Sequence, residues 1–271
     1  MALSWTVAVL LGILQGLLEW LPISSEGYVT LVLSALLEVD PLVAVQLSLF
    51  LHLGTAVAAA AYYRSPLADL LQTIRSVGGP ESVSRERWAT LWFLAVGTVA
   101  SGLVGIAVYA ALKAVLVGLP TRLFVAVIGA LLVLTGALQR YSGGGDAVGR
   151  RLPTVLDAVL VGVGQGLALL PGVSRSGTTV SLLLLRRYEE EQSLELSFVL
   201  AIPASLGAGV LVVLDIGGLP SIAPGPAGAA IIASAVVGFL TIGALVRLVR
   251  VVPFWLVCVG FGGVVLGSAL L

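Results

Sequence analysis

Long apolar segments constrain the fold of this chain more than any other feature of its sequence. A helix needs about 20 mostly apolar residues to cross the hydrocarbon of a bilayer. Of the 271 residues, 59% are hydrophobic and 10% are charged, whereas a soluble domain has about 25% charged residues. The chain is therefore predicted to be an all-α polytopic membrane protein, with one membrane domain over 1–271. The six expected spans are roughly 42–63, 88–112, 120–140, 194–214, 226–247 and 253–271.

The composition also excludes several classes of protein. The formal net charge is zero, so no nucleic-acid partner is expected. Cys258 is the single cysteine, which excludes a disulfide framework and a cysteine metal site. No basic segment precedes the first apolar run, so we expect no cleavable signal peptide.

Two further apolar runs, 5–36 and 155–187, are broken near their middle by Pro, Ser, Gly and a charged residue. A continuous helix would place those polar groups against lipid. Irregular backbone at membrane depth is tolerated only where protein or a water-filled cavity surrounds it. Both runs are therefore predicted to be re-entrant hairpins, in which a helix enters, a polar turn follows and a second helix leaves.

The basic residues support six spans and two hairpins. That arrangement places four arginine-rich loops on one side: 64–87, 140–153, 186–192 and 247–252. These loops hold eleven arginines, whereas the opposite side holds Lys113 and Arg122. Basic loops favour the cytoplasmic side. We therefore expect a multi-pass plasma-membrane protein with both termini outside.

The same arrangement divides the chain into two halves of opposite orientation, repeat A over about 1–141 and repeat B over about 153–271. Each half is one hairpin followed by three spans. At an offset of 150 residues, Gly12, Gln15, Gly16, Leu17, Ser24 and Gly27 match Gly162, Gln165, Gly166, Leu167, Ser174 and Gly177. Inverted repeats with broken helices build polar sites near the bilayer midplane.

The first hairpin carries an acid and two serines. Gln15 and Glu19 are four residues apart and share one helix face. A carboxylate at this depth costs roughly 3 kcal/mol, which makes Glu19 a candidate functional group. Ser24 and Ser25 follow a proline at an expected helix N-terminus, where backbone N–H groups attract anions. The simpler alternatives are that Glu19 only pairs with Arg175 and that one serine only caps the helix.

The second hairpin carries Arg175, whose guanidinium can bind phosphate oxygens bidentately. The alternative is a buried arginine bound to backbone carbonyls. The residues expected around a phosphate are the donors Ser174, Ser176 and Thr178 and the glycines Gly172 and Gly177. Taken alone, the two hairpins predict an anion, best matched by phosphate, held at mid-membrane beside Glu19.

At these positions the chain resembles a known family, the undecaprenyl-diphosphate phosphatases, also called bacitracin-resistance proteins. Its motif (Glu/Gln)-x-x-x-Glu leading into Leu-Pro-x-Ser-Ser-x-Gly matches Gln15 to Gly27. Its motif Pro-Gly-x-Ser-Arg-Ser-Gly-x-Thr matches Pro171 to Thr179. The resemblance covers essentially the whole chain. It implies removal of the terminal phosphate of a polyprenyl diphosphate to give the monophosphate carrier lipid, and a divalent cation, Mg²⁺ or Ca²⁺.

One position departs from the family pattern. The family usually has His after the glycine that closes the first motif, and here that residue is Tyr28. The only histidine, His52, lies in an apolar span, where we expect a core side chain. The resemblance leaves Glu19 as base or metal ligand, Ser25 as nucleophile and Arg175 as phosphate clamp. Water activated by Glu19 is the alternative nucleophile.

The expected phosphate-binding set is Ser24, Gly27, Tyr28, Gly172, Ser174, Ser176, Gly177 and Thr178, with Gln15 and Gln165 in support. The expected partners are the lipid diphosphate and membrane lipids, with a homodimer left open, and the site is expected to open toward the outer face. The main alternative function is a polyprenyl-phosphate flippase, which needs the same anion pocket but no base. A catalytically inactive homologue is the other alternative.

Overall fold

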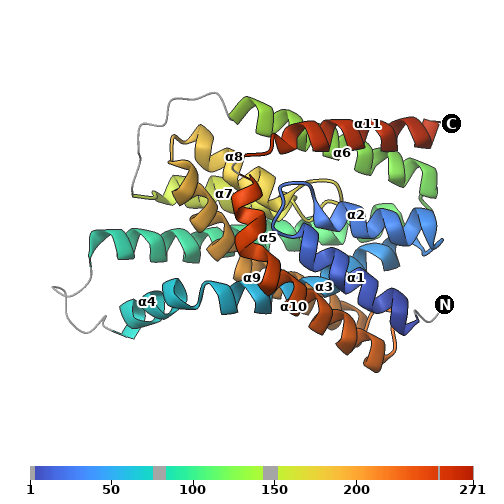
Figure 1. Cartoon of the computed structure of the whole chain (residues 1–271), viewed down its shortest axis with the longest axis horizontal. Helices are drawn as coiled ribbons and strands as arrows, with labels where there is room; N and C mark the ends of the chain where they lie inside the picture. Colours follow the sequence, from blue (N-terminus) through green and yellow to red (C-terminus); the bar gives the residue numbers. More distant parts are fainter. Residues whose placement is uncertain (1–3, 76–83, 143–151, 250, 271) are drawn as a thin grey trace.

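The computed structural model describes residues 4–75, 84–142, 152–249 and 251–270. Over these residues the chain forms eleven α-helices and a short π-helical turn, without a strand, which confirms the all-α prediction (Figure 1). The helices are α1 (Trp5–Leu18), α2 (Ser25–Leu31, extended by the π-helical turn Val32–Leu36), α3 (Pro41–Tyr62), α4 (Arg64–Arg75), α5 (Arg85–Leu116), α6 (Thr121–Ser142), α7 (Val155–Leu167), α8 (Arg175–Leu185), α9 (Glu190–Ile216), α10 (Pro224–Val249) and α11 (Phe254–Leu270).

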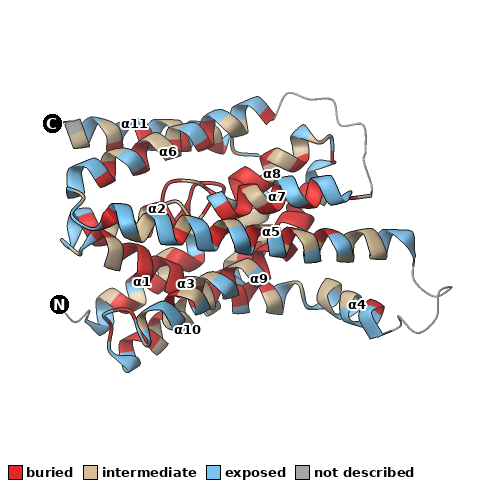
Figure 2. Ribbon diagram, turned by 180° about the vertical axis from the view of Figure 1, so that it is seen from behind, coloured by how far each residue is buried: buried red, intermediate tan, exposed pale blue. Residues whose placement is uncertain are grey.

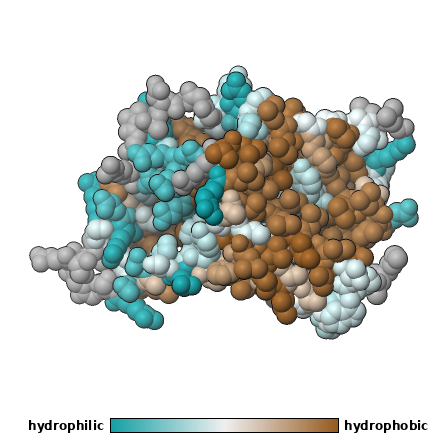
Figure 3. All heavy atoms as spheres, in the orientation of Figure 1, coloured by the Kyte–Doolittle hydropathy of each residue, from teal (hydrophilic) through white to brown (hydrophobic). Residues whose placement is uncertain are grey.

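Five helices of the described chain are long and apolar enough to cross a membrane, namely α3, α5, α6, α9 and α10. They coincide with five of the six expected spans. The sixth, 253–271, is α11, whose 17 residues place it among the shorter apolar helices. Figure 3 shows apolar side chains over the middle of the molecule and hydrophilic ones gathered toward one end. These features fit a multi-pass membrane protein.

The segment 64–87, expected as a loop between two spans, contains α4 and the start of α5, so its described part is largely helical. Apolar residues in α4 recur three and four positions apart at Leu67, Leu70, Leu71 and Ile74, which is a helical period. The charged residues around them hide this period in a hydropathy profile. Of the other expected loop, 140–153, residues 143–151 lie outside the described part of the chain.

Both broken apolar runs fold as two helices joined by a turn. Helix α1 ends at Leu18 before α2 begins, and α7 ends at Leu167 before α8 begins. Ser24 caps α2 by accepting the Gly27 N–H at 3.2 Å. Ser174 caps α8 in the same way, by accepting the Gly177 N–H at 3.1 Å. Ser24 therefore has the capping role that was considered for one serine of the first hairpin, and Ser174 has the same role in the second.

Helices from the two halves of the chain pack against each other. Helix α1 lies along α10, α7 along α5, and α6 along α11, while α3 packs on α9. Glycines permit the close approaches, as is common between membrane helices. A Cβ on Gly12 would lie 2.2 Å from the Ala230 carbonyl oxygen, and one on Gly162 would lie 2.5 Å from that of Gly97. Neither position has room for a larger side chain.

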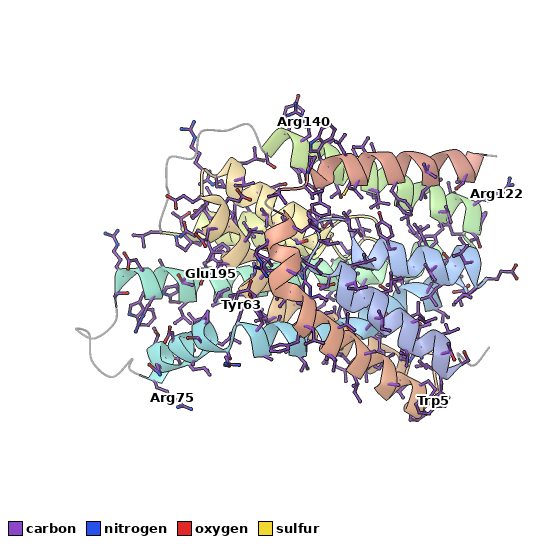
Figure 4. The ribbon with its side chains drawn as sticks, viewed as in Figure 1. Trp5, Tyr63, Arg75, Arg122, Arg140 and Glu195 are labelled. Carbon is purple, nitrogen blue, oxygen red and sulfur yellow. The ribbon has the colours of Figure 1, made fainter. Side chains whose placement is uncertain are left out.

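Different parts of the chain lie at the two ends of the molecule. Figure 1 places both termini at one end, and Figure 4 shows Trp5 and Arg122 at that end and Arg75 at the other. Both ends of the chain therefore lie at the end of the molecule opposite α4, which is the arrangement that the predicted topology requires. This separation allows the orientation of the chain to be measured with two labels.

We predict that single cysteines at Gln72 and Thr121, in a Cys258→Ala background, react from opposite sides of the membrane. Both positions are exposed, Gln72 on α4 and Thr121 at the start of α6. A membrane-impermeant maleimide should label Thr121→Cys in intact cells, and Gln72→Cys only after permeabilisation. Labelling of both cysteines in intact cells would contradict the predicted topology.

Candidate active site

The turns of the two broken helices contact each other in the interior of the molecule. Ser24 Oγ accepts the Gly172 N–H at 3.1 Å, and Ser176 Oγ donates to the Leu21 carbonyl at 3.2 Å. Gly27 lies so close to the other turn that a Cβ would be 2.9 Å from Gly172 N. Figure 2 shows buried residues concentrated where these turns meet α2, α7 and α8. The two hairpin motifs therefore form one site.

The backbone at this contact is held in unusual conformations. Ser24 has φ 64° and Gly172 has φ 102°, both in the left-handed region. Glycine adopts such values readily, whereas a serine needs support from its surroundings. Ser24 has that support, because its hydroxyl accepts N–H groups from both turns. The motif glycine at 172 and the serine at 24 are thus required by local geometry.

Helix α6 supports both turns from outside the broken helices. Gln139 Nε2 donates to the Pro22 carbonyl at 2.6 Å. Thr135 Oγ1 donates to the Gly172 carbonyl at 3.2 Å and accepts the Ser174 N–H at 3.3 Å. These bonds satisfy backbone groups that have no partner within a helix. A backbone group left without a hydrogen bond at membrane depth is costly.

Glu19 is the centre of the polar network. It is 4% exposed, and both of its carboxylate oxygens have partners. Oε1 forms an ion pair with Arg175 Nη2, while Oε2 accepts from Ser25 Oγ at 2.7 Å and from Gln15 Nε2 at 2.8 Å. His52 Nε2 lies 3.4 Å from the same Oε2. A carboxylate can remain ionised at this depth because the ion pair and these donors replace its water shell.

Arg175 has donor capacity that the protein does not use. Its Nη1 is buried and has no hydrogen-bond partner, and its guanidinium lies 6.0 Å from the centre of the Phe198 ring. A buried, unpaired guanidinium nitrogen is expensive, so an anion reaching it gains a charge-assisted hydrogen bond. Arg175 can hold Glu19 with one nitrogen and an anion with the other.

Two cavities meet at these residues. A small polar pocket of about 20 Å³ is lined by Glu19, Ser24, Ser25, Ser174, Arg175 and Ser176, together with Glu26 and His52. A larger, mostly apolar cleft of about 360 Å³ lies beside it, between α5 and α9. Glu26, His52 and Arg175 line both cavities, so the polar pocket adjoins the apolar cleft. An amphipathic ligand with an anionic head matches this arrangement.

The other expected site residues occupy supporting positions. Gln15 donates to Glu19, as described above. Gln165 donates to Ser101 Oγ at 3.2 Å and lines the apolar cleft. Gly177 lines a different cavity, of about 400 Å³, beside Trp20 and Tyr188. Thr178 is buried in the first turns of α8 and does not line the polar pocket.

Tyr28 was expected to contact phosphate, and the structure does not bring it to the pocket. Its ring stacks on Phe261 of α11, with centroids 4.4 Å apart and an interplanar angle of 14°. Apolar residues of two clusters pack around it. Aromatic stacking and burial therefore account for Tyr28.

Two residues of the pocket were not anticipated. His52 was expected to be a core side chain, but α3 carries it to Glu19, and its Nδ1 lies 2.9 Å from the Ser48 carbonyl oxygen. That contact orients the ring with Nε2 toward the carboxylate. Glu26 occupies the variable position of the first motif. The signal available for both was the cost of a polar group within an apolar segment.

The pocket contains few side chains that could hold the expected divalent cation. The described residues contain no group of three or more His, Cys, Asp or Glu side chains arranged to hold a metal ion. Glu26 Oε1, however, is buried and has no hydrogen-bond partner. This orphaned oxygen fits a cation that takes its remaining ligands from a substrate and water, as Mg²⁺ commonly does.

The fold and the site together define a class: a helical membrane protein with a buried pocket that can bind an anion between two broken helices. Residues 8–264 match the family described as bacitracin resistance protein BacA, and the chain belongs to this family. It is 53% identical to an undecaprenyl-diphosphatase of Haloarcula marismortui, over 95% of this chain and 94% of that one. It is 39% identical to an undecaprenyl-diphosphatase of Methanopyrus kandleri, over 97% of this chain and 94% of the relative.

We predict that Arg175→Lys weakens binding of inorganic pyrophosphate, used as an anion probe, at least about tenfold. Lysine keeps the charge but has one nitrogen, which cannot hold both Glu19 and the anion in the geometry of the guanidinium. Isothermal titration of the purified protein measures the change, with Arg122→Lys as the control because Arg122 is exposed and distant from the pocket. Equal affinity in Arg175→Lys and wild type would show that Arg175 only holds Glu19.

Proposed function

We propose that this protein hydrolyses an undecaprenyl-type polyprenyl diphosphate to the monophosphate carrier lipid and inorganic phosphate. One observation carries the proposal. Ser25 Oγ donates to Glu19 Oε2 at 2.7 Å, in a pocket that also holds the unpaired Nη1 of Arg175. A nucleophile, a base and an anion clamp thus lie together. The names of the relatives, undecaprenyl-diphosphatase, agree with this activity.

The first chemical step follows from the contacts of Ser25. Its Oγ attacks the terminal phosphorus while its proton passes to Glu19 Oε2, which already accepts it in a hydrogen bond. The bond from phosphorus to the bridging oxygen breaks, and the prenyl monophosphate leaves with that electron pair. Arg175 Nη1 and the backbone N–H groups at the start of α8 bind the phosphoryl oxygens. Most of the rate enhancement comes from this positioning and charge stabilisation.

The second step returns Ser25 to its hydroxyl form. Water attacks the phosphoserine, Glu19 gives its proton back to the leaving Ser25 Oγ, and inorganic phosphate is released. The protons of the attacking water leave with the phosphate, while His52 Nε2 stays 3.4 Å from Glu19 Oε2. In the alternative mechanism, water activated by Glu19 attacks the substrate directly and Ser25 only orients Glu19. A divalent cation, when bound, would supply further neutralisation of phosphate charge.

The apolar cleft supplies a place for the prenyl chain. It extends from His52 and Arg175 to residues such as Gly105, Leu211 and Leu214, in the C-terminal halves of α5 and α9. These halves run toward the end of the molecule that carries the termini (Figure 1). With the termini outside, the chain of the lipid lies in the outer half of the membrane. This supports a site that opens toward the outer face.

The architecture that we propose is two inverted repeats, A over about 1–141 and B over about 153–271, each with one re-entrant hairpin and three spans. The packing of helices between the two halves supports it, because α1 packs on α10 of the other half just as α7 packs on α5 of the first half. Matching caps at Ser24 and Ser174 also support it. Every group in the mechanism comes from one chain, so the homodimer left open by the sequence is not required.

We predict that the purified protein releases phosphate from farnesyl diphosphate and undecaprenyl diphosphate, and that Ser25→Ala and Glu19→Gln each lower the rate at least about 100-fold. Loss of Ser25 removes the nucleophile, and loss of the Glu19 charge removes the base. Phosphate release by a colorimetric assay measures the effect. Ser34→Ala, a buried serine outside the pocket, is the matched control.

The outcomes separate the alternatives. If water attacks directly, Ser25→Ala keeps measurable activity while Glu19→Gln is inactive. If the protein is a flippase, wild type releases no phosphate. Wild-type activity in Glu19→Gln would contradict the proposed mechanism, because the pocket then has no base beside Ser25.

A further inference from the structure

Glu26 is a second carboxylate in the pocket, and the mechanism above does not use it. It lies in the first turn of α2, immediately after Ser25, and is 4% exposed. Its Oε1 is buried and has no hydrogen-bond partner. Burial of an unpaired carboxylate charge is unfavourable, so the free oxygen of Glu26 attracts either a proton or a cation.

Glu19 is itself a carboxylate and cannot offset the charge of Glu26. It is also poorly suited to bind a cation. Both of its oxygens are engaged, Oε1 by Arg175 and Oε2 by Ser25, Gln15 and His52. A metal ion at Glu19 would have to displace one of these donors. The sequence had suggested Glu19 as a metal ligand, but the free oxygen belongs to Glu26.

The position of Glu26 relates it to the diphosphate of the substrate. It lines both the polar pocket and the apolar cleft, as do His52 and Arg175. With the prenyl chain in the cleft and the terminal phosphate at Ser25, the inner phosphate lies where the two cavities meet. A bare carboxylate there would repel the diphosphate. A divalent cation between them turns the repulsion into attraction, and carboxylate plus phosphate oxygens form a typical Mg²⁺ ligand set.

We propose that Glu26 Oε1 binds a divalent cation, Mg²⁺ or Ca²⁺, that joins this carboxylate to the diphosphate of the lipid substrate. The inference rests on the proposed function, since it assumes a diphosphate in the pocket. Glu26 supplies one ligand, and phosphate oxygens and water supply the others. The cation therefore enters with the substrate and binds weakly without it.

The test uses a substrate analogue that cannot be hydrolysed, farnesyl methylenediphosphonate, in which CH₂ replaces the bridging oxygen. Its affinity is measured by titration calorimetry in saturating Mg²⁺ and in EDTA. For wild type we expect binding to be at least about tenfold tighter with Mg²⁺. For Glu26→Gln we expect no Mg²⁺ effect, and affinity in EDTA equal to or higher than that of wild type, because the repulsion is gone. Unchanged Mg²⁺ dependence in Glu26→Gln would overturn the proposal.

Direct detection of the metal provides an independent readout. Mn²⁺ added with the analogue should give an electron paramagnetic resonance spectrum of bound ion in wild type and free ion in Glu26→Gln. Glu26→Asp, which keeps the charge, should retain a bound spectrum, and Glu38→Gln is the control because Glu38 is exposed and outside the pocket. Monodisperse elution of each variant verifies folding. A bound spectrum in Glu26→Gln would place the ion elsewhere.

These measurements can contradict the cation site at Glu26 without contradicting the proposed phosphatase function, and the reverse is also possible. If wild type hydrolyses farnesyl diphosphate but Glu26→Gln keeps its Mg²⁺ effect on analogue binding, the phosphatase function stands and Glu26 is not the ligand. If wild type releases no phosphate but binds the analogue in a cation-dependent way that needs Glu26, the cation site stands and the hydrolytic function is wrong.

Discussion

The ion pair between Glu19 and Arg175 is the interaction on which the rest of the structure depends. Each residue belongs to a different broken helix, and either charge alone at membrane depth would be strongly unfavourable. Together they are tolerated, because each replaces part of the water shell of the other. The pair thereby requires the two turns to lie in contact. Thr135 and Gln139 of α6 then satisfy the backbone groups that the turns leave open.

Buried polar atoms without hydrogen-bond partners are the basis for the ligand that we propose for the pocket. Among the described residues, several buried polar atoms have no partner, and two of these atoms, Arg175 Nη1 and Glu26 Oε1, belong to charged side chains. One is a cationic donor and the other an anionic acceptor, and both adjoin the same apolar cleft. In the function that we propose, a lipid with a phosphorylated head, accompanied by a divalent cation, would satisfy the two atoms and fill the cleft. The serine next to Glu19 then has a phosphorus atom to attack.

Much of this site could be predicted from sequence, because charges in apolar segments are rare and have few partners. The spans, the two breaks and the approach of Glu19 to Arg175 follow from that constraint. The rest depends on tertiary packing. Tyr28 binds Phe261 from a helix more than two hundred residues away in the sequence, and His52 reaches Glu19 from a third helix. Glu26 was overlooked because its orphaned oxygen is visible only when the surrounding donors are placed. Helix α4 was missed because its charges outweighed its helical period.

The central claim is that the two helix breaks form one site, and disulfide formation across them tests it most directly. Ser176 Oγ donates to the Leu21 carbonyl at 3.2 Å, which places the two residues at the contact. In a Cys258→Ala background, the pair Leu21→Cys and Ser176→Cys should form an intramolecular disulfide on mild oxidation in the membrane, identified by mass spectrometry of the linked peptides. The single-cysteine variants control for links between chains. Free thiols at both positions after oxidation, or links only between chains, would contradict the account.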